Sequence, residues 1–130
     1  MSDVDDAKYI SLTTFTRDGT PRATPVWITG RDGIHVFTTG AESWKTRRLR
    51  HDPRVELRVS DMRGRVEPHV PVHHGTAEVL TDDGSVAEAA RSVEDKYGLP
   101  AKLIGLIERV RSRLGRGQDT VAVRVVLDDA

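Results

Sequence analysis

The most reactive-looking part of this chain is one cationic run, ESWKTRRLRHDP at residues 42–53. Four cations fall within six positions of it, at Lys45, Arg47, Arg48 and Arg50. Residues 45–65 hold eight basic and three acidic side chains, a net charge of +5, although the whole chain has a formal net charge of zero. Because like charges repel, this concentration of cations indicates a binding site for an anion.

The surroundings of the run favour a phosphate. The run follows a predicted strand that ends at Thr38–Gly40. The N-terminus of the next helix, with its unpaired N–H groups and positive dipole end, is therefore expected beside two threonine hydroxyls. Lys45 and Arg48 are three residues apart and share a helix face, while Arg58 and Arg63–Arg65 add further cations. A phosphate, with about −1.5 to −2 charges, prefers this mixture of donors.

Two other interpretations of the cationic run remain open. The basic side chains could form a solvated helix face whose charge is partly offset by Glu42 and Asp52. A nucleic-acid-binding surface would use the same cations. The neutral charge of the whole chain and the small number of aromatic residues between the cations argue against nucleic acid.

Other catalytic chemistries find no support in the residue pattern. The chain has no cysteine, which excludes disulfides, thiolate metal sites and thiol nucleophiles. No Ser-His-Asp arrangement and no pair of carboxylates on one element stands out. His73 and His74 are neighbours on a predicted strand and so point to opposite faces, and with His69 they have no carboxylate at a usual ligand spacing. We therefore predict no metal site.

The elements that must position the cationic run are mostly short strands. Alternating residue types predict the strands, and Asp18-Gly19 and Asp32-Gly33 predict tight hairpins. Asp52-Pro53 ends the helix of the run, and Ser85 with Glu88 forms the pattern of a capping box for a later helix. The predicted strands are residues 9–15, 21–29, 34–39, 54–60, 70–80 and 120–126, and the predicted helices are residues 42–51, residues 85–97 and one that begins at Pro100.

The order β-β-β-α-β-β-α-α-β predicts a mainly-β fold. Strands joined by tight hairpins, with too few helices to cover both faces of a sheet, favour a small closed or half-closed barrel with helices packed outside. Gly75, within a predicted strand, indicates a tight interior or a close approach of another backbone. A Rossmann sheet is not expected, because no Gly-rich phosphate loop follows the first strand. Residues 1–130 are expected to form a single domain.

The remaining features concern location and assembly. The N-terminal sequence MSDVDDAKY is acidic and lacks the apolar stretch of a signal peptide, and no apolar run approaches the ~18 residues of a membrane span. We therefore expect a cytoplasmic protein that does not contact membranes. A chain of 130 residues is too short to enclose a large ligand unaided, so a deep site is expected to borrow a wall from a second copy.

Several segments, taken in order, resemble one protein superfamily. They are DGTPRATPVW, HVFTTG, ESWKTRRLRHDPRVEL, SDMRGR and HHGTAEVL, and the resemblance covers residues 8–127. The superfamily is that of the split β-barrel flavin and deazaflavin oxidoreductases, which includes the pyridoxamine-phosphate-oxidase-like proteins. The match is closest to their actinobacterial F420-dependent subgroup. The resemblance implies that the barrel is an FMN-binding split barrel.

The resemblance also implies which residues bind the cofactor. Ser43-Trp44-Lys45 matches a Ser-x-Lys element that contributes to phosphate binding after the third strand, and Pro25–Trp27 matches the strand that backs the ring system. No catalytic side chain is assigned, because the cofactor carries the chemistry. The implied cofactor-binding residues are Pro25, Val26, Trp27, Thr38, Thr39, Ser43, Lys45, Arg47, Arg48, Arg63, Gly64 and Arg65.

The aromatic residues near these segments are few. Trp27 could stack on a ring system or pack in the core, and both roles remain open. Trp44 is expected to pack beside the helix of the cationic run. Tyr97, on the apolar stripe of the later helix, is expected in the core.

The function that the resemblance implies is an F420-dependent oxidoreductase, which transfers a hydride between reduced F420 and a small organic substrate that the sequence does not identify. Members of the superfamily are typically homodimers that hold the cofactor between protomers, which implies a homodimer with the site at the subunit interface. F420 is favoured over FMN because its polyglutamate tail suits the extra arginines. The alternatives are an FMN-binding oxidoreductase and a non-enzymatic cofactor-binding or haem-binding split-barrel protein.

Overall fold

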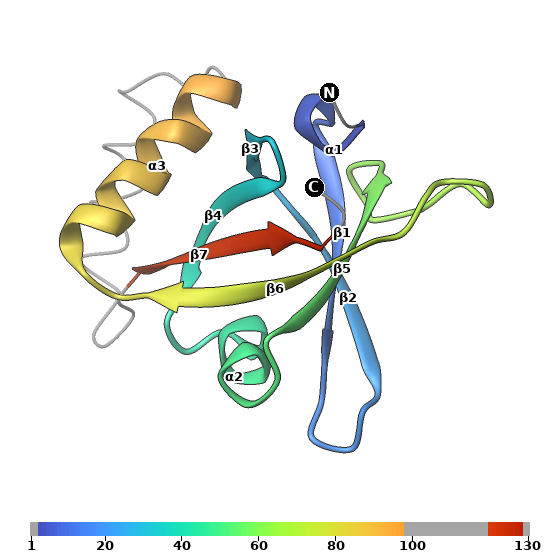
Figure 1. The fold of residues 1–130 in the computed structure, drawn as a ribbon, viewed down its shortest axis with the longest axis horizontal. Coiled ribbons are helices and arrows are strands. Elements are labelled where there is room, and N and C mark those ends of the chain that lie inside the picture. The colour runs from blue at the N-terminus through green and yellow to red at the C-terminus, as the bar shows by residue number, and fades with distance from the viewer. Residues whose placement is uncertain (1–2, 98–119, 129–130) are drawn as a thin grey trace.

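The part of the chain that the structure describes consists of strands with three helices around them (Figure 1). The structure is a computed structural model and describes residues 3–97 and 120–128. Its elements are α1 (Asp3–Asp6), β1 (Tyr9–Phe15), β2 (Pro21–Val26), β3 (Thr29–Arg31), β4 (Ile34–Gly40), α2 (Trp44–His51), β5 (Arg54–Ser60), β6 (His73–Leu80), α3 (Asp83–Tyr97) and β7 (Thr120–Leu127). The helix predicted to begin at Pro100 lies outside the described residues.

The seven strands form one antiparallel sheet in the order β2-β1-β5-β6-β7-β4-β3. Strands β2 and β3 are at opposite edges of the sheet, yet only Trp27 and Ile28 separate them in the chain. The sheet must therefore curl until its two edges approach each other. Figure 1 shows this half-closed barrel, with α3 across the outside of β4 and β7. The predicted fold class, a split barrel with flanking helices, is confirmed.

The predicted hairpins are both present. Asp32 and Gly33 form a two-residue connection between β3 and β4 and have φ values of 55° and 80°. Two positive φ values in a row are the signature of the turn whose twist suits a β-hairpin, and this is why Asp-Gly is favoured there. Gly19, in the β1–β2 connection, also has a positive φ of 86°. These turns are set by local backbone chemistry, which explains why the sequence reveals them.

The strand predicted over residues 21–29 is wrong in one respect, because it is broken between β2 and β3. At the break, the backbone of Ile28 does not pair with another strand. Its N–H and C=O groups bond instead to the side chains of Lys96 and Tyr97, near the C-terminal end of α3. Side chains of α3, almost seventy residues further along the chain, therefore satisfy the backbone at the point where β2 ends.

Helix α2 begins two residues later than predicted. Ser43 is its N-cap, since Ser43 Oγ accepts a hydrogen bond from the Thr46 N–H at 3.2 Å. The helix ends as predicted before Pro53, and the Asp52 N–H donates to the Arg48 carbonyl at 2.8 Å. Glu42 therefore precedes the helix and does not belong to its first turn.

Two predictions for the second half of the chain need correction. Strand β6 begins at His73, three residues after the predicted start. Helix α3 begins at Asp83, and Asp82 caps it by accepting the Ser85 N–H at 2.9 Å. The predicted capping box at Ser85 is wrong because an aspartate just upstream offers a strong N-cap carboxylate of its own.

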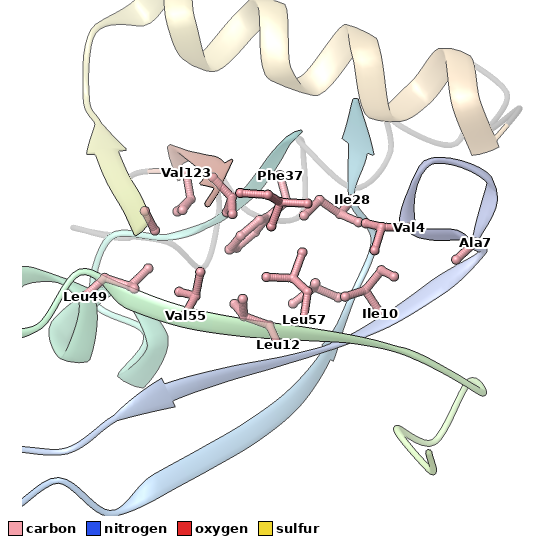
Figure 2. Close-up of a cluster of buried hydrophobic side chains, with 14 residues drawn as sticks. Val4, Ala7, Ile10, Leu12, Ile28, Phe37, Leu49, Val55, Leu57 and Val123 are labelled. Carbon is pink, nitrogen blue, oxygen red and sulfur yellow. The ribbon is translucent and has the colours of Figure 1, made fainter. Parts of the chain in front are cut away.

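The barrel encloses the hydrophobic core (Figure 2). Phe37 of β4 is 1% exposed and faces Ile10 and Leu12 of β1 and Leu57 of β5, all of which are fully buried. On β5, Val55 and Leu57 point inward while Glu56 and Arg58 alternate with them on the outer face, as the sequence predicts. Gly75 is buried, and a Cβ placed there would lie 2.5 Å from the Val126 carbonyl oxygen, which confirms the close backbone approach.

The short N-terminal helix α1 is not among the predicted elements. Its Val4 is fully buried and belongs to the core, and Asp5 Oδ1 lies 2.7 Å from Nε2 of the buried His35. A four-residue helix carries too little periodicity to be recognised in a sequence, so it depends on these tertiary contacts. Within the described part of the chain, no helix combines the length and the hydropathy needed to cross a membrane.

Candidate functional site: a cationic pair at the start of helix α2

The turn between β4 and α2 is held together by a chain of hydroxyl groups. The Thr39 hydroxyl donates to Ser43 Oγ at 3.3 Å, Ser43 Oγ and Thr46 Oγ1 are 2.9 Å apart, and Thr46 donates to the Gly40 carbonyl at 2.8 Å. The hydroxyls of Thr39 and Ser43, both predicted to bind phosphate, are thus engaged in closing the helix N-terminus. They fix the backbone geometry around the candidate site.

The backbone at the start of α2 offers donors of its own. The N–H groups of Thr46 and Arg47 bond to Ser43, but those of Trp44 and Lys45 have no acceptor among residues 3–97 and 120–128. Such first-turn N–H groups, at the positive end of the helix dipole, are common ligands of anions. Two free N–H groups therefore lie next to the cationic side chains of the same helix.

Lys45 and Arg48 form an uncompensated pair of cations. Lys45 is half-buried, and its burial, followed by the charge of Arg48, lowers its pKa below the ordinary value of 10.5. Arg48 Nη1 donates to the hydroxyl of the fully buried Thr14 at 3.1 Å, which ties α2 to β1. Neither cation has a carboxylate partner in the described part of the chain. We call Lys45, Arg48 and the two free N–H groups the anion group.

Several of the other cations of residues 45–65 already have acidic partners. Their charges are compensated locally, with N···O distances between 2.6 and 3.4 Å. The pairs are Arg47–Glu42, Arg54–Asp52, Arg58–Glu56 and Arg65–Asp61. The alternative interpretation, a solvated face of paired charges, therefore describes these four arginines well. It does not describe Lys45 and Arg48, which the sequence could not separate from their neighbours.

A second group of predicted residues lies beside β2. The carboxylate of Asp61 accepts the N–H groups of Arg63 and Arg65 at 2.8 and 2.9 Å, which folds residues 61–65 into a tight turn. This turn brings Gly64 against Pro25, since a Cβ at Gly64 would lie 3.4 Å from the proline Cδ. Pro25, which the resemblance assigns to the strand behind the ring system, and Gly64 are therefore neighbours. We call these two residues, with Trp27, the ring group.

The two groups lie along the same strand pair. Pro25 pairs with Ser11 of β1, and Arg48 of the anion group bonds to Thr14 of the same strand. Ser11 and Thr14 are three positions apart on β1, about 10 Å along the strand, and this odd spacing points their side chains to opposite faces. Arg48 therefore contacts β1 on the face of Thr14, while Pro25, the partner of Ser11, lies on the other face of the strand pair.

The remaining predicted site residues differ in how they can contribute. Val26 is 8% exposed and belongs to the core, so only its backbone could face a ligand. Thr38 is half-buried on β4, next to Thr39. Trp27 is 41% exposed. The expectation that Trp44 packs beside the helix is wrong, because Trp44 is 69% exposed, with Arg47 lying over its ring at 5.2 Å.

His73 and His74 each lie beside a carboxylate. His73 Nε2 lies 2.8 Å from Asp3 Oδ1, and His74 Nδ1 lies 3.8 Å from Glu56. As predicted for strand neighbours, the two imidazoles do not converge. In residues 3–97 and 120–128 no three His, Cys, Asp or Glu side chains gather in a way that could hold a metal ion.

Sequence reasoning missed three residues of these surroundings. Thr14 anchors Arg48 from 34 residues away, and Lys96 and Tyr97 bond to the backbone next to Trp27. Thr14 carries no recognisable signal, because a threonine in a strand is common. The apolar stripe of α3 includes Tyr97, but it does not show which segment the phenol would reach.

Comparisons with known proteins bear on the family and the fold of this chain. Residues 3–125 match the family model of pyridoxamine 5'-phosphate oxidase. The conserved hypothetical protein Rv2991 from Mycobacterium tuberculosis superposes with a TM-score of 0.70 at 25% identity, over 98% of this chain and 81% of that one. An F420 reductase gives a TM-score of 0.63 at 21% identity, over 95% and 89%. HutZ, the haem storage protein of Vibrio cholerae, gives 0.66 at 13% identity, over 96% and 84%.

These findings differ in what they establish. A search of the curated proteins gives no match to this chain. The F420 reductase and the haem storage protein, both under 25% identical, show a shared fold only. The family model, by contrast, spans nearly all of the described residues, including both the anion group and the ring group. The chain therefore belongs to the pyridoxamine 5'-phosphate oxidase family, whose split barrel it adopts.

Proposed function

We propose that this protein is an oxidoreductase that binds the deazaflavin F420 and transfers a hydride between it and a small organic substrate. The observation that carries the proposal is the uncompensated pair of Lys45 and Arg48 at the start of α2. Two cations held together without an acid raise the free energy of the ligand-free protein, and an anion bound between them would lower it. The donors of the anion group fit a phosphate.

The proposed ligand has a phosphate at one end and a ring at the other, and each of the two groups would bind one end. The phosphate would bind at Lys45, Arg48 and the free N–H groups, and the ring would lie toward Pro25 and Gly64. When bound, the cofactor supplies the hydride chemistry. The chain's own residues hold the phosphate, orient the ring against β2 and limit the access of water.

The choice of F420 over FMN rests on cations that a single phosphate does not use. Within residues 3–97 and 120–128, the Arg50 side chain donates only to the Ala41 carbonyl, at 3.4 Å, and Arg63 has no acidic partner. Arg47 and Arg65, which the sequence also offers to a longer anion, are paired with Glu42 and Asp61 and support it less. Free cations beyond the anion group suit the carboxylates of a polyglutamate tail, and an F420 reductase has the same fold.

A homodimer is part of the proposal. Lys45 and Arg48 are half-buried, while Pro25 and Trp27 are exposed on the single chain, so one copy alone leaves a ligand open to water. A second copy could cover the ligand and bury the exposed Trp44, which lies at the first position of α2. Sedimentation equilibrium with and without F420 tests this. A monomer in the presence of saturating F420 would contradict it.

The test of the proposed function is a titration of the purified protein with F420 and, separately, with FMN. The expected result is micromolar binding of F420 that Lys45→Ala weakens about thirtyfold or more. The matched control is Arg47→Ala, two residues along the same helix, where the charge that is removed is already paired with Glu42 at 3.3 Å. If the protein binds FMN and has no affinity for F420, then FMN is the cofactor and the F420 part of the proposal is wrong.

Addition of haem tests the alternative that the protein is a non-enzymatic haem-binding protein. A stoichiometric Soret band after haem addition, with no affinity for either F420 or FMN, would overturn the oxidoreductase proposal. For a protein that binds F420, mixing the reduced cofactor with a panel of small electrophilic acceptors and following its reoxidation identifies the substrate class.

A further inference from the structure

The junction between β2 and β3 is clasped by the end of α3. Lys96 Nζ donates to the Ile28 carbonyl at 2.7 Å, and the Tyr97 hydroxyl donates to the same oxygen at 3.1 Å. The Tyr97 hydroxyl oxygen also accepts the Ile28 N–H at 3.1 Å. Both backbone polar groups of Ile28 are thus satisfied by side chains of one helix. The clasp fixes the backbone next to Trp27.

The ring of Tyr97 also fixes the side chain of Trp27. The two rings are stacked, with centroids 4.9 Å apart and planes inclined by 11°. Lys96 Nζ, which donates to the Ile28 carbonyl, also lies 5.3 Å from the centroid of the Tyr97 ring. Burial raises the pKa of Tyr97 and lowers the pKa of Lys96, so both groups are held in a partly desolvated place.

Trp27 nevertheless keeps much of its surface in solvent. It is 41% exposed, although Tyr97 stacks on one face of the indole. Trp27 follows directly after Pro25 and Val26, and Pro25 contacts Gly64. A partly exposed indole, stacked on Tyr97, therefore lies two residues from Pro25, where the ring of a cofactor is proposed.

We propose that Tyr97 and Lys96 are positioning residues, which hold Trp27 in place to stack on the planar ring of the ligand. This inference rests on the proposed function. Planar rings gain from offset stacking on an indole, and a side chain already fixed in one rotamer loses less entropy when a ligand binds.

The test uses the Trp44→Phe protein, in which Trp27 is the only tryptophan. Three further substitutions are compared: Tyr97→Leu removes the stack and the hydroxyl, Tyr97→Phe removes the hydroxyl alone, and Lys96→Met removes the ammonium. Arg91→Met, at an exposed position of the same helix, is the matched control. The readouts are acrylamide quenching of Trp27, the Kd of F420 and the inhibition constant of inorganic phosphate as a competitor of F420.

Tyr97→Leu is expected to raise the quenching of Trp27 and to weaken F420 binding between about twofold and about tenfold, the range that corresponds to one aromatic pair. Its affinity for inorganic phosphate is expected to stay unchanged, because the anion group is intact. Lys45→Ala, by contrast, is expected to weaken the binding of inorganic phosphate, because it removes a cation of the anion group. Tyr97→Phe and Lys96→Met are expected to loosen Trp27 less than Tyr97→Leu, and they carry the test if Tyr97→Leu does not fold.

Two results would overturn the inference and leave the proposed function standing. One is an F420 affinity that is the same in all the Tyr97 and Lys96 variants as in the control. The other is an equal loss of affinity for F420 and for phosphate, which would indicate a general effect on the fold. If the unsubstituted protein binds neither F420 nor FMN, the proposed function fails and the inference fails with it.

Discussion

Lys45→Met is expected to weaken ligand binding without weakening the fold, and the structure gives the reason for both effects. In the ligand-free protein, a half-buried ammonium lies near the guanidinium of Arg48, and burial and that charge together lower the pKa of Lys45. Its charged form is thus disfavoured by folding. Methionine keeps most of the aliphatic stem of lysine but removes the charge.

The magnitude of the binding effect follows from the hydrogen bond that the substitution removes. A hydrogen bond between a protein cation and a ligand phosphate contributes about 2 kcal/mol. Its removal is expected to raise the Kd of F420 about thirtyfold, since each 1.4 kcal/mol is tenfold. The control, Arg47→Met, removes a cation that is 53% exposed and paired with Glu42. It is expected to change the Kd less than about threefold, as for other exposed ion pairs.

The same substitution has a signature in the pH dependence of stability. Because the pKa of Lys45 is lower in the folded than in the unfolded chain, the unfolded chain holds more protons in the alkaline range below 10.5. The free energy of unfolding of the unsubstituted protein therefore rises with pH in that range. Lys96, whose pKa is also lowered, adds to the rise in both proteins, so the difference between them isolates Lys45.

Urea denaturation of the ligand-free proteins at several alkaline pH values, together with calorimetric titration of F420, provides the measurements. We expect Lys45→Met to be at least as stable as the unsubstituted protein at neutral pH and to show a smaller rise with pH. A variant that is clearly less stable than Arg47→Met yet binds F420 normally would refute the reasoning. Lys45 would then be a structural cation, and the anion group would lose its central member.

Three further predictions concern the barrel itself. Gly75→Ala is expected to lower the free energy of unfolding measured in urea, because its Cβ would lie 2.5 Å from the Val126 carbonyl oxygen. The control, Gly84→Ala in α3, has room for a Cβ and is expected to be neutral or stabilising by up to about 1 kcal/mol. An equal effect of the two would contradict this. Phe37→Ala, at a position 1% exposed, should cost about 3–5 kcal/mol by the same assay, and a loss below about 1 kcal/mol would show that the core is not packed as described. Hydrogen bonds in the β1–β2 hairpin lower the pKa of Asp18 from 3.8 to about 2, so stability that is present above 3.8 is lost as the pH falls toward 2; an NMR titration with a midpoint near 3.8 would exclude these bonds.

Much of the architecture follows from local rules that a sequence displays. Asp32-Gly33 forms its hairpin because both residues tolerate the positive φ values that the turn requires. Helix α2 ends before Pro53 because the residue preceding proline avoids helical geometry. The alternation of β5 follows from the opposite directions of successive side chains in a strand. Each of these depends on residues within a few positions of one another.

The candidate site could be predicted only in part for the same reason. The sequence determines that cations gather at residues 45–65, since charge and spacing are printed in it. Which cations stay unpaired is decided by contacts in space. Arg47 finds Glu42 beside the turn, whereas Arg48 reaches Thr14, 34 residues earlier, where there is a hydroxyl and no carboxylate.

Tertiary structure alone decided the break in the barrel wall. The segment at residues 21–29 has the composition of a continuous strand, yet the hydrogen bonds of Ile28 go to Lys96 and Tyr97, 68 and 69 residues away. A backbone group bonds to whichever donor or acceptor the folded chain brings within reach, and residue patterns along the chain do not record that proximity. The open indole of Trp27 at this break is therefore a property of the folded barrel.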